Sequence, residues 1–85
     1  MDTIERLRKL VEYTCRAVID EDHPLAVKAV AGSENLLFEI HCEHGDVGLL
    51  IGRNGRNLEA IRTIVRSACR GATIRTSVEL CNSRR

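Results

Sequence analysis

The sequence predicts a two-layer α+β fold in which three helices cover one face of a three-stranded sheet. Its amphipathic segments follow the order helix, strand, strand, helix, helix, strand, with no linker, internal repeat or low-complexity segment between them. The second and third strands alternate apolar and polar residues, so each has one face that must be covered. The helices carry apolar stripes that can cover those faces. The 85 residues, 44% hydrophobic and 29% charged, suffice for one modest core, and we expect a single domain over residues 1–85.

The segment 1–23 is expected to form an N-terminal helix. Asp2 or Thr3 can cap its start. The helix must end before Pro24, because the residue preceding a proline avoids helical geometry. The side chains that recur at three- and four-residue spacing are Ile4, Leu7, Leu10, Val11, Thr14, Cys15 and Val18. They predict one buried face for this helix.

Residues 25–43 are predicted to form a β-hairpin. Leu25–Ala31 is the expected first strand, and Gly32–Asn35 contains residues that favour a turn. In the second strand, Leu36–Glu43, the residues of the apolar face are Leu36, Phe38, Ile40 and Cys42. The alternation predicts an antiparallel pair with one face in solvent.

Residues 46–70 are predicted to form a helix, a glycine turn and a second helix. Asp46 is a candidate cap for the short helix Val47–Ile51. The second helix should run from about Arg56 to Arg70, with an apolar stripe made of Leu58, Ile61, Ile64, Val65, Ala68 and Cys69. An outward ridge on the same helix is expected from Arg62, Arg66 and Arg70.

The last part of the chain predicts a third strand over residues 73–81. Gly71 is a suitable C-cap for the preceding helix. The residues expected to face the core are Ile74, Thr76, Val78 and Leu80. The polar tail, residues 82–85, is expected to fray.

The turn between the two central helices, Gly52-Arg53-Asn54-Gly55, has the character of an anion-binding site. Glycine lacks a Cβ and adopts backbone angles that other residues avoid, so another molecule's backbone can approach closely. The turn also opens a helix, whose unpaired N–H groups and positive dipole end favour an anion such as phosphate. The turn is therefore the first candidate for a binding site.

The charge distribution supports the same assignment. Residues 1–44 carry five Lys or Arg against nine Asp or Glu, a net charge of −4, whereas residues 45–85 carry eight against three, a net charge of +5. The basic half contains the glycine turn. This placement favours a polyanionic partner such as a nucleic acid.

Metal and thiol chemistry is not expected. The four cysteines, Cys15, Cys42, Cys69 and Cys81, form no C-x-x-C pair, which favours free structural thiols over a zinc or redox site. The residues that could be imagined as a metal cluster are His41, Glu43, His44 and Asp46. On a strand His41 and His44 would point to opposite faces, so no metal site is predicted from them.

Enzymatic and membrane functions also lack support. No Gly-Lys-Ser/Thr ends the glycine turn, as in a nucleotide-binding P-loop, and no strand directly precedes it, as in a dinucleotide fingerprint. We expect no catalytic residues, no cofactor and no small-molecule substrate. No apolar run approaches the roughly 18 to 20 residues of a membrane helix, and the charged start lacks the apolar block of a secretory signal, so a cytoplasmic location is expected.

The motif Ile51-Gly52-Arg53-Asn54-Gly55 resembles the I-G-x-x-G signature of the KH domains of RNA-binding proteins. The helix and strand before the motif resemble the type II, or prokaryotic, arrangement of that fold. The segments ERLRKLVEY, DVGLLIGRNGRNLEAIRTIVRSA and TIRTSVEL are similar to the short bacterial single-KH proteins of the KhpA (YlqC) group. The resemblance covers nearly the whole chain and implies a mixed three-stranded sheet packed against three helices.

The resemblance implies a non-catalytic RNA-binding protein, an RNA chaperone or post-transcriptional regulator, that holds roughly four nucleotides of single-stranded RNA beside the loop. Gly52 and Gly55 would admit the phosphates, and Arg53 and Asn54 would contact them. The further expected contacts are Ile51 and Leu58 as an aliphatic floor, with Arg56 and Arg62 flanking it. Many members of the group have lysine where this chain has Arg53, and arginine can bind phosphate in a bidentate way.

The resemblance also implies pairing, either as a homodimer or as a heterodimer with a larger KH-containing protein of the Jag (KhpB, EloR) kind. Two weak RNA grooves on one particle would gain avidity. The alternative function is a protein–protein interaction module of this kind, with RNA binding secondary. An exposed apolar patch away from the loop would favour it.

Overall fold

The computed structural model describes residues 2–70 and 74–82 and confirms the α+β class and the order of elements. The helices and strands are α1 (Thr3–Arg16), β1 (Leu25–Ala31), β2 (Asn35–Cys42), α2 (Val47–Ile51), α3 (Arg56–Ala68) and β3 (Arg75–Asn82). Two single turns of 3₁₀ helix flank α2, namely η1 (His44–Asp46) and η2 (Arg53–Gly55). The expected C-cap Gly71, the start of the third strand at Thr73 and the tail 83–85 lie outside the described residues.

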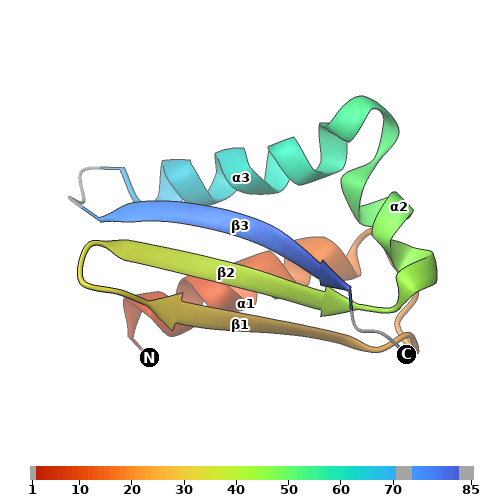
Figure 1. Ribbon diagram of the computed structural model, residues 1–85, viewed down its shortest axis with the longest axis horizontal. Helices are drawn as coiled ribbons and strands as arrows, with labels where there is room; N and C mark the ends of the chain where they lie inside the picture. The colour runs from red at the N-terminus through yellow and green to blue at the C-terminus, as the bar shows by residue number, and fades with distance from the viewer. Residues whose placement is uncertain (1, 71–73, 83–85) are drawn as a thin grey trace.

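The sheet is mixed, as expected, with β2 at its centre and the order β1-β2-β3. β1 and β2 pair antiparallel, and β2 and β3 pair parallel. A parallel pair needs a crossover connection, and α2 with α3 provides it. Figure 1 shows α1 lying behind β1 and β2, α3 running along β3, and α2 at the end of the sheet where β2 and β3 finish.

The core lies between one face of the sheet and the helices. The side chains that are less than 2% exposed include Phe38, Ile40, Leu50, Val11, Val65 and Cys15. The predicted inner face of β2 is confirmed in full, since all four of its apolar residues are buried. Because α1 and α3 cover only this side, no described helix lies over the other face of the sheet.

The N-terminal helix is shorter than the expected 1–23. It is capped by Asp2, whose carboxylate accepts a hydrogen bond of 2.8 Å from the Glu5 amide. It ends at Arg16, because the chain then bends to bury Ile19. The Arg16 guanidinium donates to the carbonyls of Asp20 and His23, at 2.7 Å each, and so holds this bend.

The apolar stripe of α3 is narrower than predicted. Ile61 and Val65 are buried, whereas Ile64 and Ala68 are exposed. The short lead-in helix buries Leu50 but leaves Leu49 and Ile51 exposed. The domain is small, and α1 and α3 do not enclose every apolar side chain between them.

Candidate nucleic-acid interface

The turn between α2 and α3 requires glycine at its first position. Gly52 has φ 78° and ψ 173°, a conformation that residues with a Cβ rarely adopt. A Cβ placed there would also lie 2.7 Å from Cγ of Asn57. Gly55 has φ 75°, but a Cβ on it would meet no described atom within 4 Å. Glycine is therefore required at position 52 by its backbone conformation and by the lack of space for a Cβ. At position 55 it is favoured by backbone conformation alone.

Hydrogen bonds from both sides hold the turn in shape. The Gly52 amide donates to the carbonyl of Gly48 at 2.9 Å, and the Gly55 amide donates to the carbonyl of Gly52 at 3.1 Å. The side-chain amide of Asn57 reaches back from α3 and donates to the carbonyl of Leu49 at 2.8 Å. Asn57 thus joins α3 to the last turn of α2 and packs against Gly52.

Asn57 was not among the predicted site residues. A short polar side chain in the first turn of a helix often bonds to nearby backbone groups, so its position next to the glycines was the available signal. Asn54 adopts a left-handed conformation, with φ 56°. Asparagine tolerates this conformation better than most residues.

The predicted phosphate contacts lie together on the surface of the turn. Arg53, Asn54 and Arg56 are exposed, whereas Gly52 and Gly55 are partly covered. Within residues 2–70 and 74–82, neither Arg53 nor Arg56 forms an ion pair. These two cations therefore stand free at the positive end of the 13-residue helix α3.

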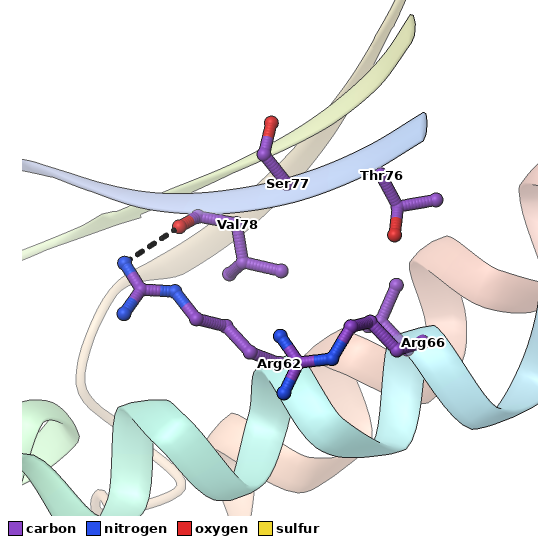
Figure 2. Close-up of a pocket in the computed structure, with 6 residues that line it drawn as sticks. Arg62, Arg66, Thr76, Ser77 and Val78 are labelled. Atoms are coloured by element: carbon purple, nitrogen blue, oxygen red, sulfur yellow. Dashed lines mark hydrogen bonds between the residues drawn. The ribbon is translucent and has the colours of Figure 1, made fainter. Parts of the chain in front are cut away.

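A groove lies farther along the same helix, between α3 and β3. It has a volume of about 210 Å³, and its lining residues are Arg62, Val65, Arg66, Thr76, Ser77 and Val78. Figure 2 shows the Arg62 side chain extending from α3 to the strand, where it donates a hydrogen bond of 3.2 Å to the Val78 carbonyl. The prediction of an outward ridge of arginines is therefore wrong for Arg62. Its side chain reaches across to β3 and does not point away from the domain.

The two arginines of the groove, Arg62 and Arg66, differ from the arginines of the turn because they already have side-chain partners. Glu59 lies 3.1 Å from the Arg66 guanidinium and 3.8 Å from that of Arg62. Arg66 also donates to the hydroxyl of Thr63 at 3.3 Å. The structure thus brings Arg62 to the groove and leaves Arg53 and Arg56 at the turn.

The predicted aliphatic floor divides into two kinds of residue. Ile51 is 36% exposed at the end of α2, whereas Leu58 is partly buried and packs against the core. Leu49, which is 52% exposed beside the turn, was not predicted. The charged surface around the turn therefore has exposed aliphatic neighbours from α2.

The start of α2 is held by a tertiary contact instead of the expected cap. Asp46 stands at the N-cap position, but its carboxylate makes no capping hydrogen bond. It is 4% exposed and lies 2.9 Å from Nδ1 of His23, which belongs to the connection between α1 and β1. This hydrogen bond raises the pKa of His23 above its ordinary value.

The structure adds two observations on the remaining expectations. All four cysteines are free, and Cys15 and Cys42 are buried as structural thiols would be. Among residues 2–70 and 74–82, no helix has the length and apolar character needed to cross a membrane.

Comparisons with known proteins agree with the geometry. A model of the KhpA/KhpB KH domain matches residues 8–80. The RNA-binding protein KhpA of Chlamydia trachomatis is 27% identical over 78 residues, which cover 92% of this chain and all of that protein. KhpA of Clostridium perfringens is 34% identical over 62 residues, covering 73% of this chain and 83% of the relative.

A solved structure shares the fold at low sequence identity. It is Era in complex with MgGDPNP and nucleotides 1506–1542 of 16S ribosomal RNA, with a TM-score of 0.60 and 16% identity. The match covers 98% of this chain and 33% of that chain, so the present chain spans about a third of the length of Era. The fold, the glycine turn and the sequence match lead to one conclusion: the chain belongs to the KhpA/KhpB family of KH domains.

Proposed function

We propose that the protein binds single-stranded RNA without catalysing a reaction, and that the turn Gly52–Gly55 holds the sugar-phosphate backbone. The observation that carries this proposal is the glycine turn at the positive end of α3, with two exposed arginines, Arg53 and Arg56, that form no ion pair with a described residue. Several relatives bear the name RNA-binding protein KhpA, and the Era structure contains ribosomal RNA.

Phosphate binding at the turn follows from its charge and shape. Exposed Arg53 and Arg56 can donate charge-assisted hydrogen bonds without first breaking an ion pair to a described residue. Asn54 adds an amide donor on the same surface. The glycines let the RNA backbone approach the start of α3, where the helix dipole favours negative charge.

The bases are proposed to lie along the groove between α3 and β3. Aromatic stacking has no partner there, since Phe38 is fully buried and Tyr13 lies on α1. Exposed Leu49 and Ile51 of α2, next to the turn, can supply an apolar surface where the bases enter the groove. The hydroxyls of Thr76 and Ser77 line the groove and can hydrogen-bond to base edges.

A single groove of this size binds weakly, so we propose that the protein works as a pair. A second apolar surface supports this, because a crevice of about 170 Å³ lies between α1 and α3, away from the turn. Its apolar lining residues include Ile4, Leu7, Leu36, Ala68 and Ile74. A homodimer, or a heterodimer with a KhpB-type protein, would present more than one groove and suit an RNA chaperone or post-transcriptional regulator.

The test is the double variant Arg53→Asp with Asn54→Asp. Two polar contacts to phosphate become repulsive, so the affinity for short single-stranded RNA should fall at least about tenfold, since each charge-assisted contact contributes roughly 1.5 kcal/mol or more. Fluorescence anisotropy with labelled oligonucleotides at several salt concentrations measures it. Circular dichroism checks that the fold is kept.

The matched control is Lys9→Asp with Ser33→Asp, which changes the net charge equally at exposed positions on α1 and in the β1–β2 turn. RNA affinity in this control should stay near that of the wild type. Equal RNA affinity in the wild type, the double variant and the control would refute the proposal that the turn binds the RNA backbone. Light scattering on the same samples measures pairing, and a strict monomer at high concentration would count against a homodimer.

A further inference from the structure

The open face of the sheet carries a group of polar side chains that the proposed RNA site does not use. No described helix covers this face, which is turned toward the viewer in Figure 1. Because side chains alternate along a strand, the residues between the buried ones point to this side. Those that bring ionisable groups to it are Lys28, Glu39, His41, Arg75, Glu79 and Cys81.

Three of these residues converge. The parallel register places His41 opposite Cys81, and Glu39 stands two residues earlier on the same face of β2. One ligand atom from each side chain, a carboxylate oxygen, an imidazole nitrogen and the thiol sulfur, lies within 4.8 Å of the other two. The Nε2 atom of His41 is already 3.1 Å from the Glu39 carboxylate.

This donor set matches the chemistry of zinc. Zn²⁺ binds cysteine sulfur at about 2.3 Å and histidine nitrogen or carboxylate oxygen at about 2.0–2.2 Å, which places tetrahedral ligands roughly 3–4 Å apart. The three ligand atoms lie within 4.8 Å of one another, so side-chain rotation has to bring them slightly closer around an ion. Mixed sulfur, nitrogen and oxygen donors also favour Zn²⁺ over Mg²⁺ or Ca²⁺, which prefer oxygen alone.

We propose that Glu39, His41 and Cys81 bind one Zn²⁺ ion per chain on the open face of the sheet. The fourth position belongs to water or to Glu79, which stands opposite Glu39 in the β2–β3 register. The partly exposed ligands leave the ion a path from solvent. The bound ion would join the central strand β2 to the edge strand β3.

The hydrogen bond between His41 and Glu39 alone does not explain the group, because it leaves the thiol of Cys81 unused beside it. Two other clusters are weaker candidates. Asp20, Asp22 and His23 are mostly exposed and offer no sulfur. The cluster of His23, Glu43 and Asp46 also offers no sulfur.

Binding must release protons, which makes it dependent on pH. The Cys81 thiol has to become a thiolate when it binds the ion. Burial raises the pKa of that thiol, the carboxylates of Glu39 and Glu79 raise it further, and Lys28 on the neighbouring strand opposes them. Zinc affinity should therefore increase with pH.

The test is a titration of the reduced, chelator-stripped protein with Zn²⁺ in competition with a chromophoric chelator. We expect one ion per chain, at least a tenfold loss of affinity in Cys81→Ser and in His41→Gln, and no loss in the control Cys69→Ser. Co²⁺ should produce a thiolate-to-cobalt charge-transfer band in the wild type and not in Cys81→Ser. Added Zn²⁺ should raise the melting temperature of the wild type and of Cys69→Ser, and not that of Cys81→Ser or His41→Gln.

Two results would overturn the proposal. One is zinc affinity that is the same in the wild type, Cys81→Ser and His41→Gln. The other is one ion per two chains with metal-dependent dimerisation, which would mean that no single chain forms the site. Circular dichroism of each variant without metal shows whether a lost affinity reflects a lost ligand or a lost fold.

Discussion

The two ends of α2 are held in place by different kinds of contact. At its C-terminal end, Asn57 donates to the Leu49 carbonyl and packs against Gly52, so every partner lies within eight residues. At its N-terminal end, buried Asp46 bonds to His23, which is 23 residues away. The first contact is local and does not titrate, whereas the second joins distant segments and depends on the protonation of a histidine.

The comparison shows how this small domain fixes its binding turn. The contact between Asn57 and Leu49 shapes the turn itself. The contact between Asp46 and His23 attaches α2, the helix that leads into the turn, to the rest of the fold. Changes at the C-terminal end of α2 should therefore alter RNA binding most. Changes at the N-terminal end should mainly alter stability.

The largest effect is expected from Gly52→Ala. The new Cβ would meet Asn57 at 2.7 Å in a backbone conformation that alanine avoids. The free energy of unfolding should fall by roughly 2–4 kcal/mol, and RNA affinity should fall with it. The matched variant Gly55→Ala, where a Cβ has open space among the described residues, should cost only about 1–2 kcal/mol. Urea denaturation of both variants measures the difference, and equal losses would contradict the role assigned to Asn57.

A smaller effect is expected from Asn57→Ala. It removes the hydrogen bond to Leu49, which should cost about 1 kcal/mol, partly offset by the better helix propensity of alanine. RNA affinity should fall more than the stability loss alone explains, because the turn loosens. The control Thr14→Ala removes a side-chain hydrogen bond of 2.8 Å within α1 and should leave RNA affinity unchanged.

Asn57→Ala also probes Gly52 in a double-mutant cycle. Combined with Gly52→Ala, it removes the Cγ and Nδ2 atoms, which would lie 2.7 and 2.8 Å from the new Cβ, and leaves only the Cβ of residue 57 at 2.9 Å. The double variant should therefore be more stable than the sum of the single losses predicts. Strict additivity would show that the two residues do not interact.

The smallest effect is expected from the pH dependence of the His23–Asp46 pair. The hydrogen bond to Asp46 raises the pKa of His23 in the folded state, so this stabilisation is fully present below the ordinary histidine pKa of about 6.5. It is lost as pH rises through the higher pKa of the folded protein. Urea denaturation between pH 6 and 8 should show this decline in the wild type and not in His23→Gln. The control His44→Gln should keep it, and the same decline in His23→Gln would refute the assignment.

The order of helices and strands, the inner face of β2 and the glycine turn were all predictable, because they depend on neighbours in the chain. Leu36, Phe38 and Ile40 alternate by two, and this spacing alone places them on one face of a strand. The end of α1 was not predictable in the same way. It depends on Arg16 reaching carbonyls in the following bend, where Ile19 turns into the core.

By itself, the sequence determined the α+β class, the position of the turn at the start of α3 and the need for glycine within it, since these follow from local geometry. Only the tertiary structure decided which distant residues meet. It placed Arg62 over Val78, bonded Asp46 to His23, and set Cys81 beside His41. The physical reason is that burial of Val78 in the core is compatible with only one register of β3 against β2. The same register determines which residues of β2 and β3 are neighbours on the open face.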